Sequence, residues 1–154
     1  MTSAFVLERP EAWTEERYFA LGETNAGVEL FDESLLVSPA PTVRHQDLSA
    51  LLREAMLPGA KAVGLRVYLA VNVRLKPGRV PIPDHRVLKM HYYAVAGIPW
   101  YLLVGSDPVT LTLYRLDGDH YVQHASAKPG ETLTLTEPVA AELDTAALDS
   151  ELDA

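Results

Sequence analysis

The sequence has no cysteine, no long apolar run, and no lysine or arginine after Lys128. Without cysteine there can be no disulfide, thiol nucleophile or thiolate ligand, so any metal must be held by carboxylate, imidazole or carbonyl groups. No apolar run approaches the ~20 residues of a membrane-spanning helix, and residues 1–10 lack a basic stretch followed by an apolar one. We therefore expect no membrane segment, no signal peptide and a cytoplasmic location.

Charge is unevenly distributed along the chain. The formal net charge of −8 opposes binding to nucleic acid, but seven acidic residues follow Lys128, so much of this charge belongs to the C-terminal segment. Between Arg66 and Lys89, six basic residues stand against Asp84 alone. Such a stretch is typical of a solvated face, and it also keeps a polyanionic substrate open.

Length and hydrophobic pattern predict one domain over residues 1–154, with an acidic C-terminus that is frayed from about residue 140. No internal repeat or low-complexity linker divides the chain. Hydrophobic periodicity and turn residues place helices and strands in alternation, which indicates a mixed α/β or α+β class.

We predict three helices: one over 15–21 with Thr14 as its N-cap, one over 42–57 that stops at Pro58-Gly59, and one over 85–96 with Tyr92 on or near its apolar face and Gly97 at the left-handed cap position. The helix over 42–57 carries one buried stripe, formed by Leu48, Leu51, Leu52, Ala55 and Met56. We predict strands over 28–32 and 35–37 that form a hairpin around an Asp-Glu-Ser turn, an alternating strand over 63–75, a central strand over 100–104, and antiparallel strands over 109–116, 121–125 and 133–135.

Three residues could carry chemistry, although each also has a plain structural interpretation. Asp84 follows an extended Val-Pro-Ile-Pro segment and precedes a helix that contains Lys89, a combination that could pair a metal-binding carboxylate with a charge-stabilising amine. An aspartate directly before a helix is equally a preferred N-cap. Lys89 could be a solvated lysine, and Glu29 a polar position in a strand. The histidines lack helical metal-ligand spacing, and no phosphate-binding glycine loop or nucleophile elbow is present.

Short motifs spread along nearly the whole chain resemble one known family. They are Val28-Glu29-Leu30-Phe31-Asp32, Leu36-Val37-Ser38-Pro39-Ala40-Pro41 with His45-Gln46, Pro83-Asp84, Arg86-Val87-Leu88-Lys89 with Tyr93-Ala94, and Ala96-Gly97-Ile98-Pro99-Trp100-Tyr101. Together they resemble the Uma-type restriction endonucleases of the PD-(D/E)XK nuclease superfamily. The block that ends in Gly-Ile-Pro-Trp-Tyr is the most specific part.

The resemblance implies a restriction-endonuclease-like mixed sheet flanked by helices, and hydrolysis of DNA phosphodiester bonds with Mg²⁺ or Mn²⁺. It assigns Asp84 and Glu29 to the metal and gives Lys89 the stabilisation of developing charge. It also implies a homodimer, because many members of the superfamily pair.

The chain departs from the family pattern after Asp84. Family members carry a strand pair there, and its glutamate is the second metal-holding carboxylate, whereas Asp84 runs directly into the Lys89 helix. Either the deletion is real and the domain is degenerate, or a segment is missing from the printed sequence. The alternative function is a non-catalytic binding or oligomerisation module in which Asp84 only caps a helix.

Overall fold

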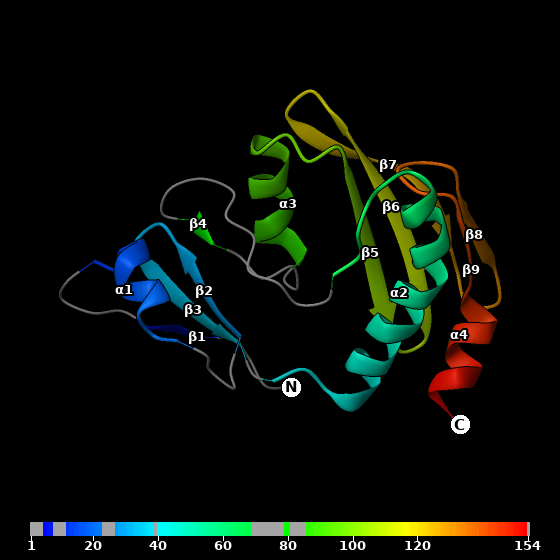
Figure 1. Ribbon diagram of the computed structural model, residues 1–154, viewed down its shortest axis with the longest axis horizontal. Helices are drawn as coiled ribbons and strands as arrows, with labels where there is room; N and C mark the ends of the chain where they lie inside the picture. The colour runs from blue at the N-terminus through cyan, green and yellow to red at the C-terminus, as the bar shows by residue number, and fades with distance from the viewer. Residues whose placement is uncertain are drawn as a thin grey trace. The chain divides into compact units, whose positions relative to one another are not determined.

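The computed structural model describes residues 5–7, 12–22, 27–38, 40–68, 79–80 and 86–153, and Figure 1 shows their helices and strands. The helices are α1 Glu15–Phe19, α2 Val43–Ala62, α3 Arg86–Val95 and α4 Thr145–Leu152. The strands are β1 Phe5–Leu7, β2 Gly27–Phe31, β3 Ser34–Ser38, β4 Arg79–Val80, β5 Trp100–Ser106, β6 Val109–Asp117, β7 His120–Ala127, β8 Thr132–Leu135 and β9 Ala141–Asp144. This confirms the predicted mixed class of helices and strands. The nuclease-type mixed sheet itself stays a prediction, since the strand pairs of the described residues are antiparallel.

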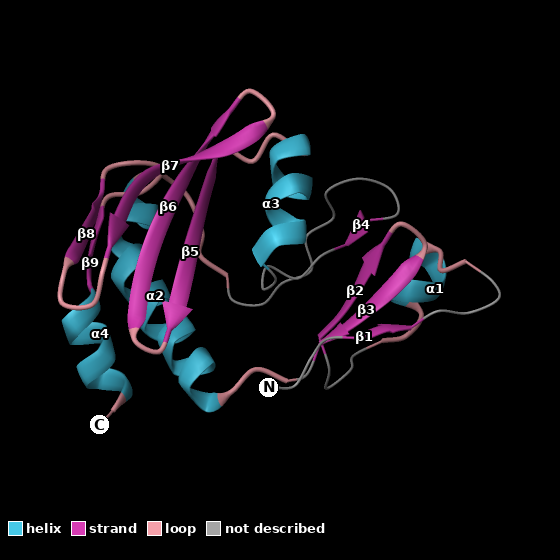
Figure 2. Ribbon diagram, turned by 180° about the vertical axis from the view of Figure 1, so that it is seen from behind, coloured by secondary structure: helices cyan, strands magenta, loops and turns pink. Residues whose placement is uncertain are grey.

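The chain divides into two compact units, each built from two separate stretches of sequence. Unit 1 comprises Met1–Pro41 and Ala70–Ala96, and unit 2 comprises Thr42–Leu69 and Gly97–Ala154. Unit 1 holds a sheet of order β1-β3-β2-β4, and unit 2 holds the sheets β5-β6-β7 and β8-β9 (Figure 2). The single domain expected over residues 1–154 stays a prediction. No helix in the described part of the chain is long and apolar enough to cross a membrane.

Unit 1 is organised around the hairpin of β2 and β3, which was predicted from the sequence. Phe31 pairs with Ser34, so the turn contains only Asp32 and Glu33, which have φ values of 42° and 67°. Positive φ at both central residues is the type I′ pattern, whose twist matches that of the flanking strands. The carbonyl of Glu33 accepts a hydrogen bond of 2.9 Å from the backbone amide of Trp13, which ties the segment before α1 to the turn.

The two faces of the hairpin have different surroundings. Leu30 and Leu35 face each other across the strands and pack with Trp13 and Tyr18 in a small apolar core. Helix α1 begins as predicted, because the side chain of Thr14 caps it by accepting from the amide of Arg17. Since side chains alternate along a strand, Glu29 and Phe31 point to the opposite face from Leu30. That second face carries the candidate site.

Unit 2 contains the larger apolar core. The predicted stripe on α2 is confirmed, because Leu48 and Leu52 are buried and Leu51, Ala55 and Met56 pack against the same core. The inward-facing residues of β6 are fully or nearly buried, as are their partners from the later strands and α4. The core consists of Leu48, Leu52, Val109, Leu111, Leu113, Ala127, Leu133, Leu135, Leu143 and Leu148.

The end of α2 differs from the prediction. We expected Pro58 and Gly59 to stop the helix, but it continues to Ala62 and is closed by Gly64 at φ 74°, where the Leu65 amide donates to the Ala60 carbonyl. Proline removes one helical hydrogen bond. Gly59 compensates by allowing close packing, because a Cβ there would collide with the backbone carbonyl oxygen of Ala140.

The C-terminal segment was expected to be frayed from about residue 140, and this was wrong. Residues from Ala141 form β9 and α4, and Asp144 caps α4. The guanidinium of Arg44 donates to the Ser106 carbonyl and to the carboxylates of Asp149 and Asp153, at 2.7–2.8 Å. The acidic residues of the tail thus hold α4 against α2 and the β5–β6 turn. Their carboxylates raise the pKa of Arg44.

Two strand predictions are tested only in part. Trp100–Val104 was expected to be a central strand; among the described residues β5 pairs with β6, and a second neighbour for β5 stays a prediction. Apolar residues lie on both faces of β5. Leu102 and Val104 pack on the core, and the ring of Tyr101 contacts Tyr114 and Tyr121. Of the strand predicted over 63–75, residues 63–68 form a turn and an irregular segment, and the remainder lies outside the described residues.

The β2–β3 turn gives a test of this hairpin. Glu33 has a left-handed backbone that glycine adopts without a steric penalty, so we expect Glu33→Gly to raise the free energy of unfolding by about 0.5–1 kcal/mol. Urea denaturation of the two proteins measures the difference. A loss of stability in Glu33→Gly would contradict the turn geometry.

Candidate functional site

Glu29 and Lys89 form a buried ion pair. The Nζ atom of Lys89 lies 2.9 Å from Oε1 of Glu29, and the two side chains are only 1% and 2% exposed. Both residues belong to unit 1 although 60 positions separate them in the sequence. The structure therefore brings together two of the three residues that the sequence singled out.

Local structure explains how the pair forms. Glu29 lies inside β2, where alternation turns it away from the apolar core that contains Leu30. Lys89 lies in the first half of α3, on a helix face shared with Tyr93 four residues later, which is also buried. Glu29, a polar residue in an apolar strand, and Lys89, a lysine on a buried helix face, are therefore each other's ion-pair partner.

A second contact joins the same helix to the same strand. The hydroxyl of Tyr92 donates to Oδ2 of Asp32 at 3.1 Å, and the ring of Tyr92 lies 5.3 Å from that of Phe31. Sequence reasoning missed the pairing of Asp32 with Tyr92, because it treated Asp32 as a turn residue and Tyr92 as an apolar one. The available signal was the spacing, since residues 89 and 92 share one face of a helix.

Tyr18 contacts the same strand as Glu29. Its hydroxyl donates to the carbonyl of Val28 at 2.9 Å. Burial raises the pKa of Tyr18, and the negative charge of Glu29 raises it further. Tyr18 therefore stays a neutral hydrogen-bond donor to the strand that carries Glu29.

Asp84, the third predicted site residue, lies outside the described residues. In the sequence it stands between two elements that both contact β2. Strand β4 pairs with β2 through Leu30–Val80 and Phe31–Arg79, and α3 reaches β2 through Lys89.

The ion pair is costly for the protein to maintain. Taking two charges out of water carries a penalty of several kcal/mol per ion, and their mutual attraction offsets it only when the geometry is good. A well-packed apolar pair of similar volume is often equally stable. Burial of Glu29 and Lys89 is therefore weak evidence for a stabilising role.

The Glu29 carboxylate is one ligand of the kind that a hard divalent cation requires. Carboxylate oxygen is the ligand that Mg²⁺ and Mn²⁺ prefer, and Mg²⁺ is often held by one or two carboxylates together with water and substrate phosphate. Glu29 supplies one such carboxylate. Among the described residues no group of three or more histidine, aspartate or glutamate side chains is placed to hold a metal.

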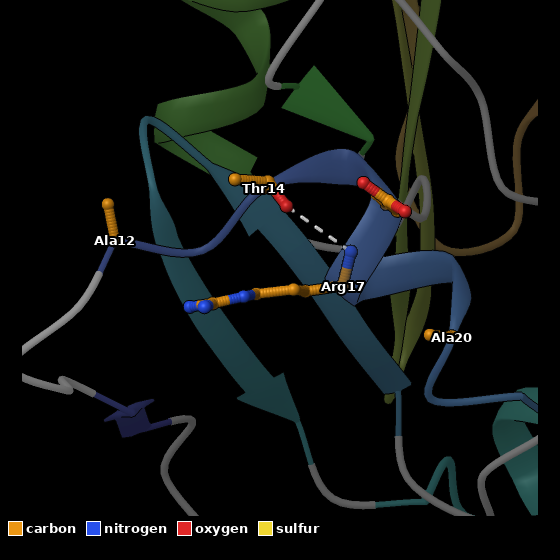
Figure 3. Close-up of a pocket in the computed structure, with 5 residues that line it drawn as sticks. Ala12, Thr14, Arg17 and Ala20 are labelled. Atoms are coloured by element: carbon orange, nitrogen blue, oxygen red, sulfur yellow. Dashed lines mark hydrogen bonds between the residues drawn. The ribbon is translucent and has the colours of Figure 1, made fainter.

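A surface hollow lies on α1, and neither Glu29 nor Lys89 lines it. It is lined by Ala12, Thr14, Glu16, Arg17 and Ala20, and Figure 3 shows the Arg17 side chain extending along it. The hydrogen bond drawn there is the helix cap between Thr14 and the Arg17 amide. The hollow is the outer surface of one short helix, and we assign no function to it.

The proposal for the function of this protein depends on the geometry described above. No protein-family model matches the chain, and a search of curated proteins found no relative.

A double-mutant cycle tests the ion pair. Lys89→Met leaves a buried carboxylate uncompensated and Glu29→Met leaves a buried ammonium, so each should lower the free energy of unfolding by about 3–5 kcal/mol. The double variant should be more stable than either single variant, because it buries no unpaired charge. Chemical denaturation of the four proteins measures this. Additive losses would contradict a direct pair.

Proposed function

We propose that the protein is a restriction-endonuclease-like enzyme of the Uma type that hydrolyses DNA phosphodiester bonds with Mg²⁺ or Mn²⁺. The observation that supports this proposal is the buried ion pair of Glu29 and Lys89, which joins two of the three residues that the resemblance assigns to the site. Asp84 is the third proposed residue, and it stands between β4 and α3 in the sequence.

The proposed roles follow from the charges of these groups. Hydrolysis of a phosphodiester increases negative charge on the phosphoryl oxygens, and an amine that is already fixed in place stabilises this charge without reorganisation. In this proposal Glu29 holds Lys89 in position and offers a carboxylate oxygen, and Asp84 offers a second carboxylate. When bound there, the divalent cation would polarise the phosphate and lower the pKa of a bound water.

The proposed substrate, location and oligomeric state of the enzyme are those expected from the sequence. Its substrate is DNA, its location is cytoplasmic, no membrane partner is proposed, and it acts as a homodimer. The basic residues Arg66, Arg74, Lys76, Arg79 and Arg86 favour a polyanionic substrate, since cationic side chains displace counterions from phosphates.

One observation favours a second function, a non-catalytic binding or oligomerisation module. The pair of Lys89 and Glu29 is at most 2% exposed, and its two charges already neutralise each other. A phosphodiester can reach it only if the surroundings open locally. In the module, the ion pair fixes α3 on β2 and Asp84 caps the helix, so divalent cations do not stabilise the protein.

DNA cleavage separates the two functions. With Mg²⁺ or Mn²⁺ we expect the purified protein to nick plasmid DNA, and we expect EDTA to stop it. Asp84→Ala and Lys89→Met should each lower the rate by about 100-fold or more, because each removes a group that stabilises the transition state. Asp47→Ala is the matched control, since Asp47 is an exposed aspartate on α2.

The outcomes divide clearly. If cleavage persists in Asp84→Ala, it comes from a contaminant, and this result contradicts the proposed nuclease activity. Absence of cleavage, together with a melting temperature that no divalent cation raises, supports the module instead. Circular dichroism of each variant shows whether a lost rate reflects lost folding.

A further inference from the structure

Two polar side chains of helix α3, Lys89 and Tyr92, contact β2 and the turn that follows it, and the proposed function uses only Lys89. Lys89 reaches Glu29, and three residues later Tyr92 reaches Asp32. On the strand side the two partners are also three residues apart, with Glu29 inside β2 and Asp32 in the turn that ends it. The Tyr92 contact therefore needs an explanation of its own.

The two contacts differ in stiffness. A lysine side chain has four rotatable bonds, so an ion pair at its end does not by itself fix the rotation of the helix that carries it. Tyrosine has two side-chain torsions, and here both ends of the side chain are held. The ring of Tyr92 packs against Phe31 with an interplanar angle of 33°, and its hydroxyl donates to Asp32.

The backbone that carries the acceptor is also held, while the Asp32 side chain and its hydrogen bond to Tyr92 are exposed. Asp32, with φ 42°, is the first residue of the two-residue turn. The turn is closed on its strand side by the pairing of Phe31 with Ser34. The next residue, Glu33, is tied through its carbonyl to the amide of Trp13. The backbone of Asp32 is thereby fixed relative to β2, and so to Glu29.

We infer that Tyr92 is a positioning residue for Lys89: anchored on Asp32 and Phe31, it sets the rotation of α3 that brings the Lys89 amine to Glu29. Residues three apart lie on one helix face, so fixing Tyr92 also fixes the direction in which Lys89 leaves the helix. The inference rests on the proposed function for its catalytic meaning. The position of the Lys89 amine, which the inference concerns, is tested by an experiment that needs no metal, no DNA and no catalytic turnover.

Amine labelling tests this role in the intact protein. Acetylation by acetic anhydride, followed by mass spectrometry of peptides, gives the modification rates of Lys89 and of Lys61, an exposed lysine on α2. Tyr92→Phe removes only the hydroxyl, and we expect it to raise the rate at Lys89 about fivefold, the effect of losing one hydrogen bond, while Lys61 is unchanged. Tyr114→Phe, which removes a tyrosine hydroxyl in unit 2, should leave both rates unchanged.

A rescue variant distinguishes positioning from general stability. Asp32→Asn keeps an acceptor oxygen and a residue type that tolerates positive φ, so it should protect Lys89 nearly as well as the wild type. An unchanged Lys89 rate in Tyr92→Phe overturns the inference. A parallel rise at Lys89 and Lys61 also overturns it, because this would show loosening of the whole protein. Neither result depends on whether the protein cleaves DNA.

Discussion

The buried ion pair between Glu29 and Lys89 is the constraint on which the arrangement of unit 1 depends. An unpaired charge at either position would be strongly destabilising, so α3 must lie where the amine can reach the carboxylate. The rest of the unit is consistent with this requirement. Leu30 and Leu35 fill the opposite face of the hairpin, and the tight turn at Asp32 provides a second attachment for α3 through Tyr92.

Unit 2 is built on a different principle. Its main core cluster consists of apolar side chains, from Leu48 on α2 to Leu148 on α4, and the ion pairs of Arg44 lie near the surface. Surface ion pairs contribute little to stability, whereas apolar burial contributes much more. Unit 2 therefore has the features of a scaffold. The buried ion pair of Glu29 and Lys89 lies in unit 1.

The sequence predicted those features whose cause is local. The Thr14 cap, the hairpin of β2 and β3 and the left-handed Gly97 after α3 follow from residue types at fixed positions. Predictions failed where tertiary contacts decided the outcome. Helix α2 continues past Pro58, where Gly59 packs closely against Ala140, and the acidic tail folds because Leu143 and Leu148 are buried in the core of unit 2. Of the site, the residue types of Glu29 and Lys89 were readable, but the contact of Tyr92 with Asp32 needed the fold.

Binding of Mn²⁺ tests the central claim, that the ion pair marks a metal-dependent site, more directly than any other measurement. The electron paramagnetic resonance signal of free Mn²⁺ falls when the ion binds protein, so titration with the wild type, Glu29→Gln and Asp84→Asn gives the affinity of each. The proposed function predicts a bound ion in the wild type and a loss of affinity of about tenfold or more in both variants, because each removes a charged oxygen ligand. Equal binding by all three proteins, or none by the wild type, would contradict it.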